Sequence, residues 1–347
     1  MPDKEVIHQG MRKKRWIGGW CFLLLAAGCA GPKPVVTTIL QGHTQGGSYR
    51  VVVKSDRDRS DLQEPVDSLL GVIERSMSLY DPRSLICRLN RNETDSLDLF
   101  ITRCIETAAE ISRESDGYYD ITVKPLVEAW GFLDKNTSAK SPNIDSLLQY
   151  VGYEKIAIRD GRLAKSSPGV QIDLNSIAQG ATADEVGRFL EEKGIGEYLI
   201  EVGGGEIFCR GTNPNGTPWR VGIDKPAEGN FTPGANLQMR LHISDQGLAT
   251  SGNYRKFKLL DDGRKVVHTL NPKTGYSVES NLLSATVLAE SAALADAYGT
   301  LLMVLGLERS IDFLATKPGL LACLIHLDET GKYQTWISPR LERKIIQ

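Results

Sequence analysis

The chain has 347 residues, of which 41% are hydrophobic and 24% are charged, a composition typical of a globular protein with one large domain or two smaller ones. The formal net charge is −2. Because no broad basic field is present, we expect no nucleic-acid partner and exclude that class of function.

The N-terminal stretch has the composition of a targeting segment. Residues 11–15 read M-R-K-K-R, and residues 16–28 form an apolar run that is too short to span a bilayer comfortably. The run ends in L-A-A-G-C, so small residues precede Cys29, as in a bacterial lipobox, where the cysteine is lipidated. The alternative is a plain secretory signal cut near Ala30. Both interpretations place the mature chain outside the cytoplasm.

These features predict the segments of the chain. A signal peptide is expected over 1–28, with Met11 as an alternative start, and a lipid-anchored tether over 29–37. One folded domain is expected over 38–343, since no long linker, repeat or low-complexity block interrupts it. The predicted location is the cell envelope, lipid-anchored to the inner or outer membrane and facing the periplasm.

The cysteines do not indicate a metal centre. The sequence holds six, of which Cys21 and Cys29 lie in the targeting segment; the others are Cys87, Cys104, Cys209 and Cys323. They are widely spaced and contain no C-x-x-C pair, which argues against zinc. We expect scattered buried thiols, with a disulfide as the alternative in an oxidising compartment.

Apolar periodicity predicts the elements of the domain in chain order. A strand at 48–53 is followed by helices at 62–79, 97–115, 124–130 and 143–150, short strands at 154–159 and 162–165, and a helix at 176–193. Then come strands at 197–202, 205–210, 218–223, 236–243, 247–250, 254–260 and 265–270. A strand at 283–289, helices at 291–304 and 307–315, and strands at 320–326 and 332–337 close the chain. Successive strands without intervening helices indicate an α+β fold, with a mostly antiparallel sheet flanked by helices.

The first candidate site motif precedes the helix at 176–193. Residues 173–180 read D-L-N-S-I-A-Q-G, so Asp173, Asn175 and Ser176 crowd the helix start. A helix N-terminus carries unpaired N–H groups and the positive end of the dipole, which suits a phosphate. The structural alternative is a capped helix, with Asn175 or Ser176 as the N-cap.

The second motif is a run of glycines between two strands, Gly203, Gly204 and Gly205. Glycines let a flat or phosphorylated ligand approach the backbone, although a tight hairpin turn is an equal explanation. The run is neither G-x-G-x-x-G nor a P-loop, so a Rossmann site is not implied.

The third motif pairs Asp296 with Thr300 on one helix face, because they are four residues apart. Two hard oxygen donors, with a backbone carbonyl and ligand phosphates, would suit Mg²⁺. The alternative is a solvated aspartate and a threonine bonded back to its own helix.

Further polar and aromatic residues lie at turns. Arg255 could pair with a phosphate, and His268 precedes an N-P-K-T-G turn and could polarise a phosphoryl oxygen or accept a proton. Tyr80 and Tyr118 lie beside turns, where a tyrosine can stack on a planar ring. The alternative is a hydrogen-bonded neighbour for His268, and core packing or turn capping for the tyrosines.

The order of these motifs resembles one family. From Ser78 to Gly306 the sequence closely resembles the ApbE family, the FAD:protein FMN transferases, many of which are lipoproteins. The family pattern M-S-x-Y-D-P is matched at 77–82, G-x-F/Y-D-x-T-V-x-P-L-V-x-x-W-G-F at 117–132, and D-L-x-x-I-A-x-G at 173–180. The glycine loop, the A-T-S-G-x-Y-R strand, the H-x-x-x-P-x-T-G turn and the A-D-A-x-x-T helix follow in order.

The resemblance implies a Mg²⁺-dependent transfer of the FMN half of FAD to a Thr or Ser hydroxyl of a target flavoprotein, with release of AMP. The implied metal ligands are the side chains of Asp296 and Thr300 and the carbonyl of Ala178. The implied FAD-contacting positions, together with those read from the residues themselves, are Tyr80, Tyr118, Tyr119, Asp120, Asn175, Gly203, Gly204, Gly205, Arg255 and His268. His268 and Asp173 are the candidates for the catalytic base.

The sequence departs from the family at two positions. The first strand of the family often reads M-G-T-x-Y, whereas residues 45–49 read Q-G-G-S-Y, and Gln179 stands where members often have lysine.

The alternatives to transfer are an FAD pyrophosphatase and a flavin-binding lipoprotein without turnover. By analogy, the acceptors would be flavin-carrying subunits of membrane redox pumps.

Overall fold

The computed structural model describes residues 34–133, 142–226, 234–253, 257–259 and 265–346. These residues belong to a compact unit that begins at Pro34. The predicted lipidation site, Cys29, and Arg255 lie outside the described residues.

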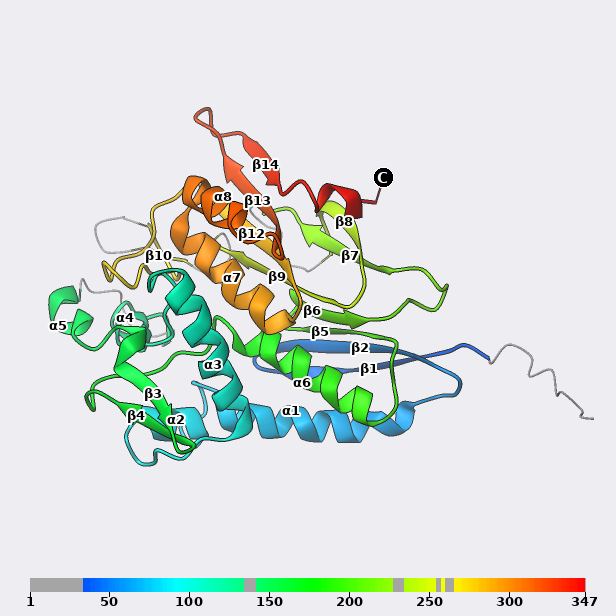
Figure 1. Cartoon of the computed structure of the whole chain (residues 1–347), viewed down its shortest axis with the longest axis horizontal. Coiled ribbons are helices and arrows are strands. Elements are labelled where there is room, and N and C mark those ends of the chain that lie inside the picture. The colour runs from blue at the N-terminus through cyan, green and yellow to red at the C-terminus, as the bar shows by residue number, and fades with distance from the viewer. Residues whose placement is uncertain (1–33, 134–141, 227–233, 254–256, 260–264, 347) are drawn as a thin grey trace, which may run out of the picture. The chain divides into compact units, whose positions relative to one another are not determined.

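An antiparallel sheet of eight strands forms the centre of the unit (Figure 1). In spatial order the strands are β1 (Val36–Thr44), β2 (Gly47–Ser55), β5 (Tyr198–Val202), β6 (Glu206–Arg210), β9 (Gln246–Gly252), β12 (Leu282–Ala289), β13 (Leu321–Leu327) and β14 (Tyr333–Ile337). Every neighbouring pair is antiparallel. The predicted α+β class with a mostly antiparallel sheet is therefore confirmed.

Helices cover one face of the sheet (Figure 1). They are α1 (Gln63–Met77), α6 (Ala178–Glu192) and α7 (Ala292–Leu305), with α3 (Leu99–Glu114) and α8 (Leu307–Ala315) packed against them. Side chains alternate along a strand, so in β12 Ala285 and Val287 share a core with the helices, whereas Leu288 faces the other side. The amphipathic and apolar helices predicted from the sequence bury their apolar faces here.

A separate hairpin covers the opposite face of the sheet. It consists of β7 (Trp219–Asp224) and β8 (Leu237–Ile243), which pair with each other. Their buried side chains, including Trp219 and Leu241, form a core with Cys209 and Cys323 of the central sheet. The central strands β12 and β13 are therefore buried on both faces, which explains why both are largely apolar.

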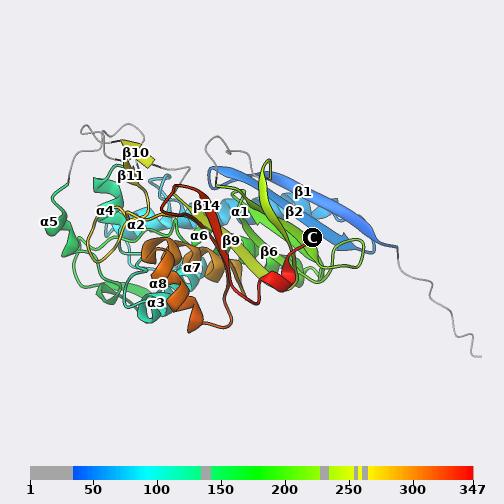
Figure 2. The same cartoon turned by 90° about the horizontal axis from the view of Figure 1, so that it is seen from above.

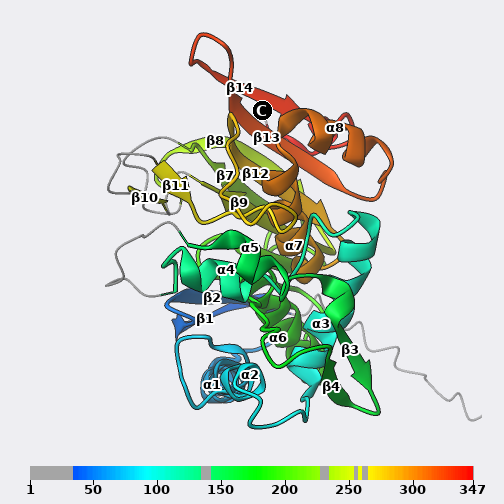
Figure 3. The ribbon, with the colours of Figure 1, turned by 90° about the vertical axis from the view of Figure 1, so that its left-hand side faces the viewer.

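Shorter elements complete the unit. They are α2 (Leu85–Asn90), α4 (Lys124–Ala129), α5 (Ile144–Leu148), β3 (Ile156–Arg159), β4 (Arg162–Lys165), β10 (Phe257–Leu259), β11 (Lys265–Val267) and the 3-10 turns η1 (Ser60–Leu62), η2 (Tyr153–Lys155) and η3 (Glu342–Lys344). Figure 2 shows the α4–α5 pair and the β10–β11 hairpin at the same end of the unit, and Figure 3 looks onto that end.

One strand and one α-helix were not predicted. β1 begins at Val36, two residues before the expected start of the domain, and supplies the edge strand of the sheet. α2 has only six residues, too few for a helical period to be recognised. None of the helices in the described parts of the chain combines the length and the apolar composition that a bilayer span would need.

The cysteines of the domain are free thiols. Cys87, Cys104, Cys209 and Cys323 are all buried and none is in a disulfide. Burial raises the pKa of Cys209 and of Cys323 to about 12, which keeps both thiols protonated.

Candidate functional site

The segment before α6 is a turn rather than a helix cap. α6 begins at Ala178, and its N-cap residue, Ile177, has no side chain that could accept a hydrogen bond. The expectation that Asn175 or Ser176 is the N-cap is therefore wrong. Asp173 stabilises the turn instead, because its Oδ1 accepts a hydrogen bond from the backbone N–H of Asn175 at 2.8 Å.

The acceptor for the start of α6 comes from a distant helix. The N–H of Gly180 donates to Oδ2 of Asp296 in α7 at 3.2 Å. In return, Asp184 of α6 accepts from the first amides of α7, with Ala292 N to Oδ1 at 2.8 Å and Ala293 N to Oδ2 at 2.9 Å. We call these five residues the helix junction. Sequence analysis missed Asp184, because an aspartate inside an amphipathic helix is normally solvated.

Oxygen donors lie around Asp296. Its carboxylate is buried, and Thr300 is one helical turn later. The hydroxyl Oγ1 of Thr300 lies 3.4 Å from Oγ of Ser251 in β9. The third predicted metal ligand, the carbonyl oxygen of Ala178, accepts a hydrogen bond from Oγ1 of Thr182 at 2.7 Å. Within the described residues, no three His, Cys, Asp or Glu side chains gather closely enough to hold a metal by themselves.

The glycine run packs against the start of α6. Gly203 and Gly204 have φ values of +71° and +87°, which favour glycine. A Cβ on Gly203 would stand 2.3 Å from Nε2 of Gln179, so the absence of a side chain lets that amide lie against the loop. A Cβ on Gly205 would meet nothing within 4 Å. The loop and the helix start therefore form one continuous backbone surface.

The turn between β1 and β2 reaches the same surface. Gln45 donates from Nε2 to Oγ1 of Thr182 in α6 at 2.7 Å. Its other amide atom, Oε1, is buried and has no hydrogen-bond partner within the described structure. A buried acceptor without a partner is costly, so it marks a position where a ligand N–H could bind. The departure from the family pattern at position 45 thus places an amide, rather than an apolar side chain, at the site.

Tyr80 has an exposed ring and a partnered hydroxyl. The residue is 66% exposed, yet its hydroxyl end is shielded and hydrogen bonds to the side chain of Asn175. Desolvation of the hydroxyl and the nearby negative charge of Asp173 raise the pKa of Tyr80. The structure therefore joins Tyr80, Asn175 and Asp173, and leaves a ring available for stacking.

Tyr119 and Asp120 lie deeper than expected for ligand contacts. Tyr119 is only 2% exposed, and its hydroxyl lies 3.0 Å from Oγ of Ser176. The buried Asp120 accepts from both the N–H and the hydroxyl of Thr122 at 2.7 Å, and burial raises its pKa to about 6. Asp173 N donates to the carbonyl of Ile121 at 2.7 Å, which fixes this segment beside the turn before α6.

Tyr118 lies between cationic side chains. The guanidinium carbon of Arg309 is 4.0 Å from the centre of its ring, and Nζ of Lys273 is 5.7 Å away. Arg309 comes from α8 and Lys273 from the turn at 271–275. These contacts fix the ring by cation–π attraction, so Tyr118 is less open to a flavin than Tyr80.

His268 precedes that turn and is half-buried. Its ring makes an edge contact with Phe132, with ring centres 6.5 Å apart. The turn itself follows the predicted chemistry, since Asn271 Oδ1 accepts from Lys273 N at 2.9 Å, and Gly275 has a positive φ. Trp130 anchors it by donating from Nε1 to the carbonyl of Gly275 at 2.9 Å.

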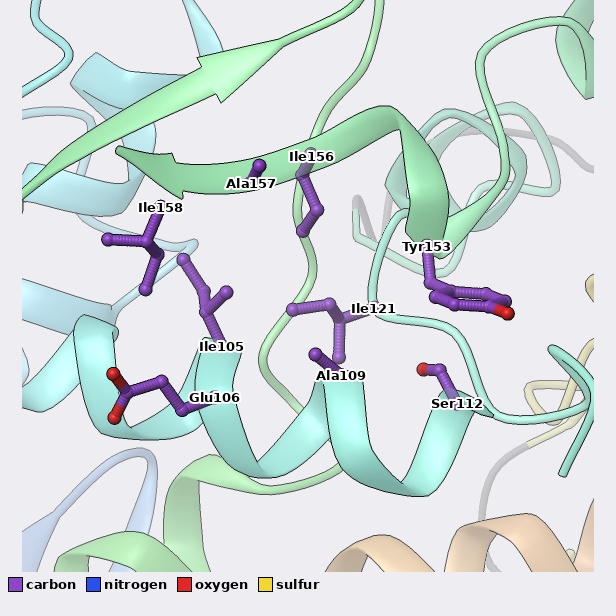
Figure 4. Close-up of a pocket in the computed structure, with 9 residues that line it drawn as sticks. All are labelled: Ile105, Glu106, Ala109, Ser112, Ile121, Tyr153, Ile156, Ala157 and Ile158. Atoms are coloured by element: carbon purple, nitrogen blue, oxygen red, sulfur yellow. The ribbon is translucent and has the colours of Figure 1, made fainter. Parts of the chain in front are cut away.

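A small groove between α3 and β3 borders the segment of Tyr119 and Asp120 through Ile121 (Figure 4). Its volume is about 170 Å³, and it is lined by Ile105, Glu106, Ala109, Ser112, Ile121, Tyr153, Ile156, Ala157 and Ile158. None of the predicted site residues lines it. It is also smaller than the ~300 Å³ or more usual for small-molecule sites, so we do not assign the nucleotide to it.

The remaining arrangement suits a phosphorylated ligand with a planar ring. It combines a helix start, a glycine loop, one buried carboxylate with nearby hydroxyls, and an exposed tyrosine ring. Amides and hard oxygens can bind phosphate and a divalent cation, while the tyrosine can stack.

Comparisons with known proteins identify the family. The model of the ApbE family matches residues 45–325. The chain is 33% identical to the FAD:protein FMN transferase of Escherichia coli K12, over 93% of this chain and 95% of the relative. It is also 33% identical to the protein of that name from Vibrio cholerae, over 86% of this chain and 90% of the relative.

Solved structures show the same fold. The flavin transferase ApbE from Vibrio cholerae superimposes with a TM-score of 0.78 at 29% identity, over 90% of this chain and 100% of that one. The ApbE protein from Thermotoga maritima gives a TM-score of 0.77 at 25% identity, over 90% and 100% of the two chains. The sequence motifs, the architecture and both sets of relatives agree, and the chain belongs to the ApbE family.

Proposed function

We propose that this protein is an FAD:protein FMN transferase, which moves the FMN half of FAD to a Thr or Ser hydroxyl of a target flavoprotein. The observation that carries the proposal is the 33% identity to proteins of that name over 93% of the chain, a stretch that includes every candidate site motif. The acceptor oxygen would attack the phosphorus of the FMN phosphate, and the bond from that phosphorus to the AMP moiety would break. AMP leaves, and the hydroxyl proton passes to a base.

The residues around Asp296 fit a magnesium ion. The donor set consists of the buried carboxylate of Asp296, the hydroxyl of Thr300 and the carbonyl of Ala178, whose oxygen has a second lone pair beside the one used by Thr182. One carboxylate with other hard oxygens and ligand phosphates is usual for Mg²⁺. When bound, the ion would neutralise the charge that develops on the diphosphate.

The chain itself would position the substrate. The glycine loop would receive the ligand at Gly205, where a Cβ would meet nothing within 4 Å. The N–H groups of Ala178, Gly180 and Gly203 already donate to Leu174, Asp296 and Ser48. Tyr80 offers a ring for stacking, and Oε1 of Gln45 offers an unsatisfied acceptor. Phosphoryl transfer depends mainly on positioning and charge stabilisation, which these groups supply.

Two residues are candidates for the base. Asp173 is buried next to Tyr80 and Asn175, and His268 is half-buried beside the turn at 271–275. A pH–rate profile separates them, because loss of the base removes its ionisation from the acidic limb of the profile. We expect either His268→Ala or Asp173→Asn, but not both, to remove that limb.

The proposal extends to the location and the partners, with support from the N-terminal sequence and the family resemblance. We propose a lipid anchor at Cys29 that holds the domain on a bacterial membrane, facing the periplasm. Flavin-carrying subunits of membrane redox pumps are the proposed acceptors. Labelling with radioactive palmitate, compared with a Cys29→Ser variant, tests the anchor, and equal labelling of the two would contradict it.

One experiment tests the reaction. The protein is incubated with FAD, Mg²⁺ and a flavoprotein subunit that carries an acceptor threonine, and the products are separated by denaturing electrophoresis. We expect the subunit to fluoresce under ultraviolet light and AMP to appear in equal amount. Free FMN and AMP without a fluorescent subunit would indicate a pyrophosphatase instead. Neither product would indicate a flavin-binding protein without turnover.

A further inference from the structure

The helix junction contains a buried carboxylate that no step of the proposed reaction uses. Asp184 is 5% exposed, and its two oxygens accept from Ala292 N and Ala293 N at 2.8 and 2.9 Å. These two amides are among the first N–H groups of α7, which have no partner within the helix itself. Two hydrogen bonds to one carboxylate fix both the position and the orientation of the helix start.

The same helix start is enclosed by backbone on two sides. A Cβ on Gly180 would stand 2.2 Å from the carbonyl oxygen of Ala292. A Cβ on Gly247 of β9 would stand 2.3 Å from the N atom of Ala292. α7 can approach α6 and β9 this closely only because both residues are glycine. The position of Asp184 relative to α7 is therefore closely defined.

Asp296 lies one helical turn after these amides. Ala292 and Ala293 precede it by four and three residues, so the three residues belong to one rigid turn. A displacement of the first amides would carry Asp296 with it. Asp296 also accepts from Gly180 N of α6. A carboxylate of each helix therefore binds backbone amides at the start of the other helix.

We propose that Asp184 is a positioning residue for the metal: through the amides of Ala292 and Ala293, it sets where the carboxylate of Asp296 lies. The inference rests on the proposed function, because it takes Asp296 as a ligand of the metal. Asp184 contacts neither the metal nor the nucleotide in this role. Partners that orient a metal ligand commonly change metal affinity by about 10–100-fold when they are replaced.

The test replaces Asp184 with asparagine in the full-length protein. Asparagine has nearly the same size and keeps one acceptor oxygen, but it turns an NH₂ group toward an N–H donor of α7. Binding of Mn²⁺ is measured by electron paramagnetic resonance, with and without FAD and in the absence of an acceptor protein. We expect the dissociation constant for Mn²⁺ to rise about tenfold or more. The Mg²⁺ concentration for half-maximal transfer should rise with it, while kcat at saturating Mg²⁺ stays within about twofold.

Glu185→Gln provides the matched control. Glu185 is the next residue of α6 and is similarly buried, but it pairs with Arg103 at 2.6 Å and Arg188 at 2.9 Å. These ion pairs join Glu185 to α3 and to its own helix, not to α7, so its loss should lower stability without changing the affinity for Mn²⁺. Asp184→Ala, which removes the carboxylate without adding a competing donor, replaces Asp184→Asn if that variant does not fold.

The outcomes separate this inference from the proposed function. Unchanged Mn²⁺ affinity in the Asp184 variant, or an equal change in Glu185→Gln, would overturn the positioning role even if FMN transfer is observed. Weaker Mn²⁺ binding by the Asp184 variant alone would support it, even if no flavin reaches an acceptor protein. In that second case the metal site would be supported, whereas the proposed FMN transfer would be contradicted.

Discussion

The helix junction and the ring residues of the site are held by different means. Here the ring residues are Tyr80, Tyr118 and His268. Backbone N–H groups and glycines fix the helix junction, where a Cβ on Gly180 would overlap the carbonyl oxygen of Ala292. The ring residues are fixed by side-chain contacts instead. Tyr80 contacts Asn175, Tyr118 contacts Arg309, and His268 contacts Phe132.

This difference matches what each part would recognise under the proposed function. A metal ion and a diphosphate need oxygen atoms placed within a few tenths of an ångström, which packed backbone provides. A planar ring tolerates sliding, because stacking depends weakly on the exact offset. We therefore expect large effects from changes in the helix junction and small ones from changes in the ring residues.

The largest effect is expected for Asp296→Ala. Loss of the carboxylate removes the main charge available to a metal, so FMN transfer should fall about 100-fold or more, while circular dichroism shows a folded protein. Asp312→Ala, which removes an exposed helical aspartate from α8, is the control and should keep full activity. Full transfer by Asp296→Ala in excess Mg²⁺ would refute the metal assignment.

Gly247→Ala tests whether the helix junction is enclosed by backbone. The added Cβ would stand 2.2 Å from the carbonyl carbon of Ser291, and neither strand nor helix can easily withdraw. We expect the free energy of unfolding in urea to fall by about 1–3 kcal/mol. Gly196→Ala is the control, since its Cβ would meet nothing within 4 Å. Equal unfolding free energies for Gly247→Ala and Gly196→Ala would contradict the claim that backbone encloses the helix junction.

Asp120 is a buried carboxylate that directly follows Tyr118 and Tyr119 in the chain. Burial raises its pKa from 3.8 to about 6, so the folded state disfavours the ionised form. The contribution of Asp120 to the free energy of unfolding is therefore largest below pH 3.8, where it is protonated in both the folded and the unfolded chain. It is lost as the pH rises to about 6, because the unfolded chain ionises first.

Asp120→Asn removes this titration and keeps the acceptor for Thr122. The unfolding free energy of the wild type should fall relative to the variant between about pH 4 and 6, by at most about 3 kcal/mol. Urea unfolding at several pH values measures the difference. A difference between the two proteins that does not vary with pH would show that Asp120 has an ordinary pKa.

The smallest effect is expected for Tyr80→Ala. Stacking of an exposed ring contributes about 0.5–1.5 kcal/mol, so KM for FAD should rise by tenfold at most, with little change in kcat. Tyr333→Ala, which removes another exposed tyrosine from β14, should leave KM unchanged. An effect on transfer as large as that of Asp296→Ala would mean that the position of the Tyr80 ring is as critical as that of the proposed metal ligand.

Most elements of the fold could be predicted from the sequence, because helices such as α3 and strands such as β12 have strong apolar periodicity. The edge strand β1 was missed because two of its buried side chains, Thr38 and Thr44, are polar and interrupt the alternating apolar pattern. The spatial order of the strands depends on long-range pairing, such as that of β2 with β5, for which one sequence has no local signal.

The site could be predicted in part. The motif residues Asp173, Asn175 and Tyr80 do lie together, as does Asp296 with the start of α6. The role of Asp184 could not be predicted, since its partners are backbone amides 108 and 109 positions away and any residue can supply an amide. The helix cap was misplaced for the same reason, because the acceptor is 116 residues distant.

The mutual dependence of α6 and α7 has a consequence for how the protein is made. Each helix start is completed by a segment more than a hundred residues away, so a chain that is still being synthesised lacks half of the arrangement. Loop closure over such a distance comes late in folding. At the proposed site, nascent or truncated chains would therefore be unable to capture nucleotide, and flavin binding there would report that synthesis has reached the second helix.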